Sequence, residues 1–263
     1  MALVEYSAAD GIATLTLTFP PANCYTHEMM RELDEAILKA RFDDSVHVIV
    51  LVGAGEKFFC AGADINMLKT VTPRFKYFFC LHANETLNRL EQTPKLVIAA
   101  INGNCVGGGL EIAMAADLRI ARKGAGKLGL PEVTLGVLAG TGGTQRLARI
   151  VGKSAAIELM SSGRLFEVEE ARQRGIVNSV IDAPDRASFL AKVLEFARGY
   201  CPPHKASRAV GMIKRAVQSG SELDLHDALA LERELQQQLF ESEDAREGLG
   251  AFIEKRKPAF KGC

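Results

Sequence analysis

Runs of apolar residues predict four strands in the first half of the chain. Residues 12–18 (IATLTLT) alternate in apolar character, which is typical of a half-buried strand. The runs at 46–52 (VHVIVLV) and 96–101 (LVIAAI) are continuously apolar and rich in β-branched residues. Such runs predict strands that are buried on both faces. A shorter run at 118–121 predicts a fourth strand.

Helical periodicity separates these strands. A helix is expected over about 27–41, with Thr26 as its N-cap. Its apolar face consists of Met30, Leu33, Ile37 and Ala40. A second helix is expected over 73–92, before Pro94, and from about 142 onward the chain reads as helix after helix. Because strands and helices alternate, the pattern predicts an α/β core.

The C-terminal part differs from this core. Cys201-Pro202-Pro203 is the best candidate boundary, which divides an α/β core at 1–200 from a helical region at 201–263. The late helices carry leucine-rich faces, with Leu231, Leu235 and Leu239 on one, and Leu249, Phe252 and Ile253 on another. A short tail could not bury this surface alone, so we expect the region to form an oligomer.

Composition and charge exclude several classes of function. The 32 basic and 32 acidic residues balance, which argues against nucleic acid or an anionic membrane as a partner. The first Lys or Arg is Arg31, so no signal or transit peptide is expected, and no run is long enough to span a membrane. The six cysteines form no C-x-x-C pair. We therefore expect free thiols, no metal site and a cytoplasmic location.

Two glutamates stand alone in apolar, glycine-rich segments. Glu111 is the only charge between Lys95 and Asp117, and Glu132 is the only charge between Lys127 and Arg146. We expect both segments to be largely buried, where an unpaired carboxylate costs several kcal/mol. Each glutamate could pair with a distant base or reach solvent from a loop. Two such carboxylates nevertheless favour acid/base chemistry.

Glycines beside these acids suggest an anion-binding backbone. Gly107-Gly108-Gly109 precedes an apolar run at 110–116 that reads as a buried helix. The free N–H groups of a helix N-terminus can stabilise an oxyanion, although the glycines would equally suit tight helix–strand packing. A second possible donor loop is CAGAD at 60–64.

Four segments together carry a family resemblance. They are FFCAGADI (58–65), AAINGNCVGGGLEIAMAADLRIA (99–121), LGLPEVTLGVLAGTGGTQRLARIVG (128–152) and FIEKRKPAFKG (252–262). In this order and spacing they resemble the crotonase superfamily, and most closely its enoyl-CoA hydratase branch. The resemblance implies a spiral of ββα units with a C-terminal helical trimerisation tail. It also implies a homotrimer or a homohexamer.

The resemblance also implies roles for individual residues. The oxyanion-hole N–H groups fall on Ala63 and Gly108, and the catalytic acids on Glu111 and Glu132. Contacts with the substrate and its coenzyme A part fall on Ala22, Cys24, Ala61, Asp64, Ile65, Gly140, Phe252 and Lys255. The last two would meet coenzyme A across a subunit boundary. Candidates for the acyl pocket are Tyr25, Met67 and Leu138.

The implied activity is reversible syn addition of water across the C2–C3 double bond of an enoyl-CoA. Glu111 is favoured as the base that activates water and Glu132 as the acid. The partner is an acyl-CoA substrate, and no separate cofactor is expected because coenzyme A is part of that substrate. Alternatives within the family are a dehydratase of branched 3-hydroxyacyl-CoA, an isomerase and a decarboxylase.

Two alternatives lie outside that chemistry. A two-carboxylate enzyme acting on sugars is disfavoured, because the chain has no Trp and only four Tyr to stack on a sugar ring. A protein that binds coenzyme A without catalysis is disfavoured by the pair of glutamates.

Overall fold

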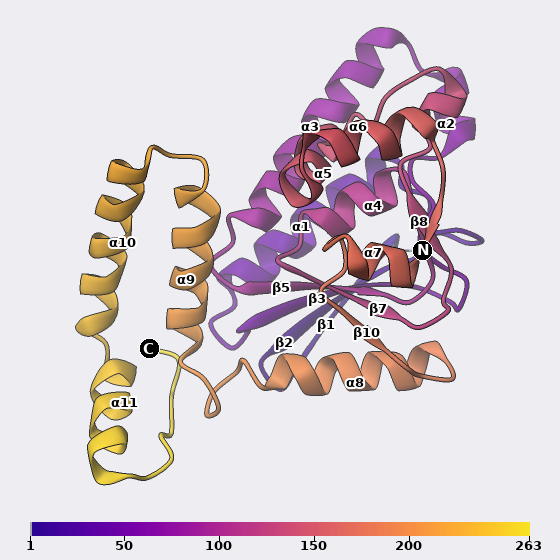
Figure 1. Ribbon diagram of the computed structural model, residues 1–263. Helices are drawn as coiled ribbons and strands as arrows, with labels where there is room; N and C mark the ends of the chain where they lie inside the picture. The colour runs from indigo at the N-terminus through magenta and orange to yellow at the C-terminus, as the bar shows by residue number, and fades with distance from the viewer. Residues whose placement is uncertain (1) are drawn as a thin grey trace.

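The strands form two sheets in the computed structural model, which describes residues 2–263 (Figure 1). The six-stranded sheet has the order β1 (Val4–Ala9), β2 (Ile12–Leu17), β3 (Val48–Gly53), β5 (Leu96–Ile101), β7 (Leu118–Arg122), β10 (Ser179–Ile181). The four-stranded sheet has the order β4 (Phe58–Cys60), β6 (Asn104–Val106), β8 (Lys127–Gly129), β9 (Phe166–Glu167). Neighbouring strands are parallel except in the pairs β1–β2 and β8–β9.

Helices follow the strand pairs in a repeating order. Each of β3, β5 and β7 lies in the large sheet, and the strand after it lies in the small sheet before a helical segment begins. The first helices are α1 (His27–Phe42), α2 (Ile65–Thr70), α3 (Pro73–Glu91), α4 (Gly108–Met114) and the 3₁₀ turn η1 (Glu132–Leu135). The later helices are α5 (Gly143–Val151), α6 (Lys153–Ser162), α7 (Val168–Gln173), α8 (Arg186–Arg198), α9 (Ser207–Gly220), α10 (Leu225–Phe240) and α11 (Glu243–Glu254).

The strands β3 and β5 of the large sheet are buried on both faces, as their apolar runs predict. In β3, Ile49 and Leu51 pack in the same core as α1, whereas Val48 and Val50 pack against α8. Figure 1 shows α8 on one side of this sheet and α1 and α4 on the other. Alternate side chains of a strand point to opposite faces, so both cores draw on one continuous apolar run.

The long elements lie where the sequence predicts them. The helix expected at 27–41 is α1, and the Thr26 hydroxyl accepts a hydrogen bond from the Met29 N–H. The helix expected at 73–92 is α3, and β2, β3, β5 and β7 cover the four predicted strands. The expectation of helices alone after residue 142 is wrong, because β9 and β10 lie there. Strands of two or three residues are too short for a periodic pattern.

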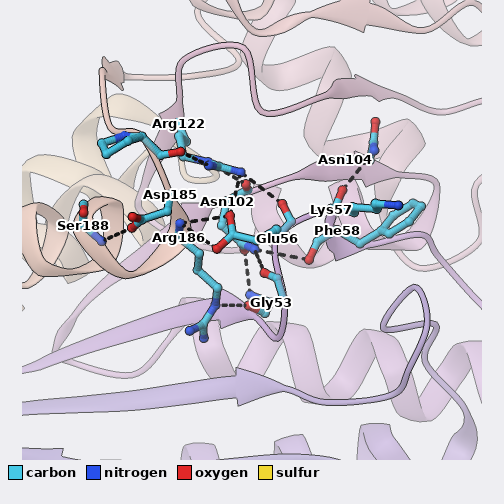
Figure 2. A network of polar contacts seen from close by, with 12 residues as sticks. Gly53, Glu56, Lys57, Phe58, Asn102, Asn104, Arg122, Asp185, Arg186 and Ser188 are labelled. Carbon is cyan, nitrogen blue, oxygen red and sulfur yellow. Dashed lines mark hydrogen bonds and ion pairs between the residues drawn. The ribbon is translucent and has the colours of Figure 1, made fainter.

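A polar network fixes the connection between the two sheets (Figure 2). The Asn102 side chain, directly after β5, accepts from the Gly53 N–H at 2.9 Å and donates to the Gly55 carbonyl at 2.9 Å. Arg122, at the end of β7, donates to the Asn102 carbonyl at 3.1 Å. Arg186 donates to the Gly53 carbonyl at 2.6 Å. These bonds hold the segment that leads into β4 and the loop beyond it.

Helices α9, α10 and α11 form an arm beside the large sheet (Figure 1). Lys214 of α9 is buried and forms an ion pair with Asp117 at 2.9 Å. Asp117 also accepts from the Val97 N–H at 2.7 Å, so this pair ties the arm to β5. The predicted boundary at 201–203 falls between α8 and α9. That the two parts are separate domains stays a prediction. Among residues 2–263, no helix has the length and apolar character needed to cross a membrane.

Candidate active site

Two loops that lie far apart in sequence are joined by backbone hydrogen bonds. The Ala61 N–H donates to the Ala22 carbonyl at 3.0 Å, and the Tyr25 N–H donates to the Gly62 carbonyl at 2.9 Å. The Asp64 N–H donates in turn to the Tyr25 carbonyl at 3.0 Å. The sequence-predicted contact residues at 22–24 and 61–64 are therefore neighbours. These backbone hydrogen bonds fix the position of Ala63, whose N–H group is the first candidate oxyanion donor.

Asn23 stabilises this pair of loops, a role that its sequence context does not predict. It is buried and has a φ of +53°, a left-handed conformation that Asn tolerates better than most residues. Its side-chain oxygen accepts from the Phe19 N–H at 3.2 Å, and its amide donates to the Ala54 carbonyl at 2.9 Å. The Asn23 side chain thus satisfies backbone groups of both Phe19 and Ala54.

The second candidate donor lies against the first loop. Gly62 has a φ of +92°, and a Cβ there would lie 3.1 Å from the Gly108 nitrogen. A Cβ on Gly109 would lie 2.0 Å from the Cys60 carbonyl oxygen, so only glycine permits this approach of α4. Within residues 2–263, the N–H groups of Ala63 and Gly108 donate to no acceptor. Two free donors on adjacent segments form a site that can accept an oxyanion.

Glu111 is held rigidly in the first turn of α4. The side chain is buried, and Oε1 accepts from the Thr141 and Gly143 N–H groups at 2.7 Å each. Burial raises the pKa of Glu111, while the two backbone N–H groups act against that rise by stabilising the carboxylate. Among the ion pairs within residues 2–263, none involves Glu111. Its charge is compensated by the backbone of the loop before α5.

Glu132 has a different environment at the start of η1. Its Oε2 is buried without a hydrogen-bond partner within residues 2–263, and a Cβ on Gly107 would lie 3.1 Å from its Oε1. Burial, followed by repulsion from Glu111, raises the pKa of Glu132 to about 7. A carboxyl group with that pKa can both hold and release a proton near neutral pH.

The segment around Glu132 is less buried than the sequence predicts. Residues 133–138 are exposed, and Leu138 is 69% exposed. The expectation of a largely buried segment is wrong here, because η1 and the turn after it lie on the surface and expose Val133, Leu135 and Val137. Apolar composition predicts burial only where a neighbouring element covers the segment.

Tyr25 lies beneath the site and does not line it. The residue is 2% exposed, and a Cβ on Gly108 would lie 2.2 Å from its Cε1. Its hydroxyl is 3.0 Å from the Thr141 hydroxyl, next to the N–H that binds Glu111. The expectation that Tyr25 lines the acyl pocket is therefore wrong. Its ring instead packs against Gly108, the second candidate oxyanion donor, and its hydroxyl supports the loop that holds Glu111.

The remaining predicted residues fall into two groups. Gly140 directly precedes Thr141, whose N–H binds Glu111; the Gly140 carbonyl accepts from Asn84, and a Cβ there would lie 3.1 Å from the Cys80 Sγ. Cys24 is half-buried and Ile65 is 45% exposed, so the surface beside the oxyanion loop is partly open. Phe252 and Lys255 are at the end of α11, on the far side of the molecule from α4 (Figure 1). One chain alone does not bring these two residues to the site.

Two further features bear on ligand binding. A cavity of about 920 Å³ lies between α3, α5 and α9 and includes Leu138 and Gly140 in its lining, but neither catalytic candidate. In the described part of the chain, no group of three or more His, Cys, Asp or Glu side chains could hold a metal ion.

Comparison with known proteins gives a consistent result. The family described as "Enoyl-CoA hydratase/isomerase" matches residues 7–263. The chain is 38% identical over 263 residues to a probable enoyl-CoA hydratase of Bacillus subtilis, covering 100% of both proteins. It is 38% identical over 247 residues to a short-chain-enoyl-CoA hydratase of Clostridium acetobutylicum, covering 94% of this chain and 92% of that one. A crystal structure of an enoyl-CoA hydratase from Geobacillus kaustophilus superposes with a TM-score of 0.96 at 45% identity, covering 100% and 98%.

The chain belongs to the enoyl-CoA hydratase/isomerase family, in the enoyl-CoA hydratase branch of the crotonase superfamily. It is an enzyme of the hydro-lyase class. The mixed α/β fold with parallel sheets is the one expected from the resemblance.

Proposed function

We propose that the protein is an enoyl-CoA hydratase that adds water reversibly, in the syn sense, across the C2–C3 double bond of an enoyl-CoA. The thioester oxygen accepts hydrogen bonds from the Ala63 and Gly108 N–H groups. As the water oxygen bonds to C3, negative charge develops on that thioester oxygen, where the two donors stabilise it. No separate cofactor takes part, because coenzyme A is a portion of the substrate.

The two glutamates divide the proton transfers according to their environments. Glu111 accepts a proton from water, because its two backbone hydrogen bonds stabilise it as a carboxylate. Glu132, whose pKa is raised to about 7, delivers a proton to C2. Water thereby loses one proton to Glu111, and C2 gains one from Glu132. In dehydration the same groups exchange these roles.

One observation carries this proposal. Two unpaired backbone donors and two carboxyl groups that interact electrostatically converge on one surface of α4. The test is the purified protein with crotonyl-CoA, followed by loss of the absorbance of the conjugated thioester and by chromatography of the product. 3-Hydroxybutyryl-CoA is the expected product. Recovery of crotonyl-CoA alone, or of its 3-butenoyl isomer, would refute hydration.

The proposed enzyme is a homotrimer or homohexamer built on the arm. Apolar side chains on α9–α11 are strongly exposed in one chain, including Phe252 at 84%, Ile253 at 79% and Leu225 at 72%. Association would bury this surface, and it could bring Phe252 and Lys255 to the coenzyme A of a neighbouring subunit.

Light scattering coupled to gel filtration is expected to give at least three times the chain mass of 28.4 kDa at micromolar concentration. Phe252→Asp introduces charge into the exposed face and should shift the protein towards smaller species. Phe42→Asp is the matched control, since Phe42 is 79% exposed at the end of α1, outside the arm. A monomer mass for the unmodified protein would refute the proposal.

A further inference from the structure

Lys76 lies on the face of α3 that points towards the glutamates. Two residues of this face lie against the loop at Gly140: Asn84 donates to the Gly140 carbonyl, and a Cβ on Gly140 would lie 3.1 Å from the Cys80 Sγ. Residues four apart on a helix share a face, so Lys76 continues this row one turn nearer the N-terminus of α3.

Aromatic rings connect Lys76 to the oxyanion donor. The Lys76 Nζ lies 5.2 Å from the centre of the Phe79 ring, and that ring lies 5.5 Å from the ring of Tyr25. The Tyr25 ring in turn packs against Gly108. Two aromatic rings therefore link Lys76 to the segment that carries the Gly108 N–H.

The Lys76 ammonium has no carboxylate partner of its own. It forms no ion pair within residues 2–263 and is half-buried beside the Phe79 ring. The charges that it faces belong to the two catalytic candidates. Burial raises the pKa of both glutamates overall, and the positive charge of Lys76 acts against that rise at each of them.

The unpaired Lys76 ammonium affects which acyl chains the site can bind. A neutral alkyl chain would leave the ammonium partly desolvated and without an anion. A second carboxylate on the acyl chain would instead be repelled by Glu111 and Glu132 unless a cation stood beside them. Lys76 supplies that cation, and its flexible stem can follow the position of the anion.

We propose that Lys76 forms a carboxylate-binding subsite, so that the preferred substrates are enoyl-CoA thioesters whose acyl chain ends in a second carboxylate close to C3. The proposal rests on the proposed hydratase function and names its substrate class. The carboxylate binds the Lys76 ammonium by a charge-assisted hydrogen bond, beside the Phe79 ring and away from the two catalytic carboxyl groups.

The test compares two substrates that differ only in that carboxylate. Crotonyl-CoA and glutaconyl-CoA share the reacting atoms, and glutaconyl-CoA carries a carboxylate in place of one hydrogen on C4. Lys76→Met is expected to lower the ratio of kcat/KM for glutaconyl-CoA to that for crotonyl-CoA by about 10–100-fold. Lys76→Arg should restore most of that ratio, because it keeps the charge.

Arg74→Met is the matched control. Arg74 lies on the same helix, is exposed and stacks on Phe78. The Arg74→Met variant therefore measures any general attraction between anionic substrates and α3. It should leave the ratio unchanged. An equal fall of the ratio in Arg74→Met and Lys76→Met would overturn a specific subsite.

Binding of the saturated thioesters tests the subsite without turnover. By calorimetry, the unmodified protein should bind glutaryl-CoA more tightly than butyryl-CoA, and Lys76→Met should abolish that preference. If Lys76→Met weakens both thioesters equally, the lysine contacts a phosphate of coenzyme A and the proposal is overturned. If the protein binds glutaryl-CoA selectively but hydrates neither enoyl-CoA, the subsite stands and the hydratase function fails.

Discussion

Replacing either candidate acid by its amide is expected to lower kcat for hydration by about 10²–10⁴-fold. In Glu111→Gln, the amide oxygen can still accept from the Thr141 and Gly143 N–H groups, so the loop keeps its position while the base is lost. In Glu132→Gln, the site loses the group that would protonate C2. Initial rates with crotonyl-CoA measure both effects. Turnover close to that of the unmodified protein in either variant would remove that residue from the mechanism.

The stability of Glu132→Gln provides a control with a predicted sign. The pKa of Glu132 is raised from 4.5 to about 7 in the folded protein, so between these pH values the folded state binds more protons than the unfolded state. The free energy of unfolding therefore falls as pH rises through this window, and the Gln variant lacks that fall. Relative to the unmodified protein, Glu132→Gln should gain about 1–2 kcal/mol between pH 4.5 and pH 8, after allowance for solvent screening.

Denaturant unfolding at the two pH values measures this difference. A folded Gln variant that is inactive but more stable at pH 8 would separate the loss of the acid from a loss of structure. No change in relative stability between the two pH values would mean that Glu132 ionises normally in the free enzyme.

Gly108→Ala is expected to lower kcat by about 10²–10³-fold, the usual cost of one lost oxyanion donor. The new methyl group would lie 2.2 Å from Tyr25 Cε1 and 2.5 Å from its hydroxyl oxygen, so the ring or the start of α4 must move. Because the Tyr25 ring is enclosed, we expect α4 to shift and to carry the Gly108 N–H away from the thioester.

Gly250→Ala is a suitable control for this variant, since a Cβ at Gly250 meets no atom within 4 Å. Rates, substrate affinity and circular dichroism should be compared for the two variants. A folded Gly108→Ala enzyme with nearly normal kcat would show that this N–H does not stabilise the transition state.

The sequence predicts the long elements and the acids, but not how they meet. The strands β3 and β5 and the helices α1 and α3 follow from apolar runs and caps that lie within one segment. Glu111 and Glu132 stand out because each is the only charge in an apolar segment. These features are local, and local patterns are what a single sequence records well.

Contacts between segments that are distant in sequence are not predictable from local sequence patterns. The contact between Tyr25 and Gly108 joins residues whose separation in sequence carries no pattern. Lys76 looks like an ordinary basic residue on the polar side of an amphipathic helix, and only the packing of α3 against the Gly140 loop shows what it faces. Likewise, the exposure of residues 133–138 depends on the tertiary packing, which leaves this segment uncovered.

Both proposed oxyanion donors are main-chain groups, and the proposed base, Glu111, is held by main-chain groups as well. The reacting atoms are therefore positioned by parts of the chain that most side-chain exchanges leave in place. Side chains on α2 and α3 can then vary to suit different acyl groups while the bond-making geometry stays constant. For redesign, this means that libraries restricted to exposed positions such as Ile65 and Phe75 should change which thioester is accepted without rebuilding the reaction centre.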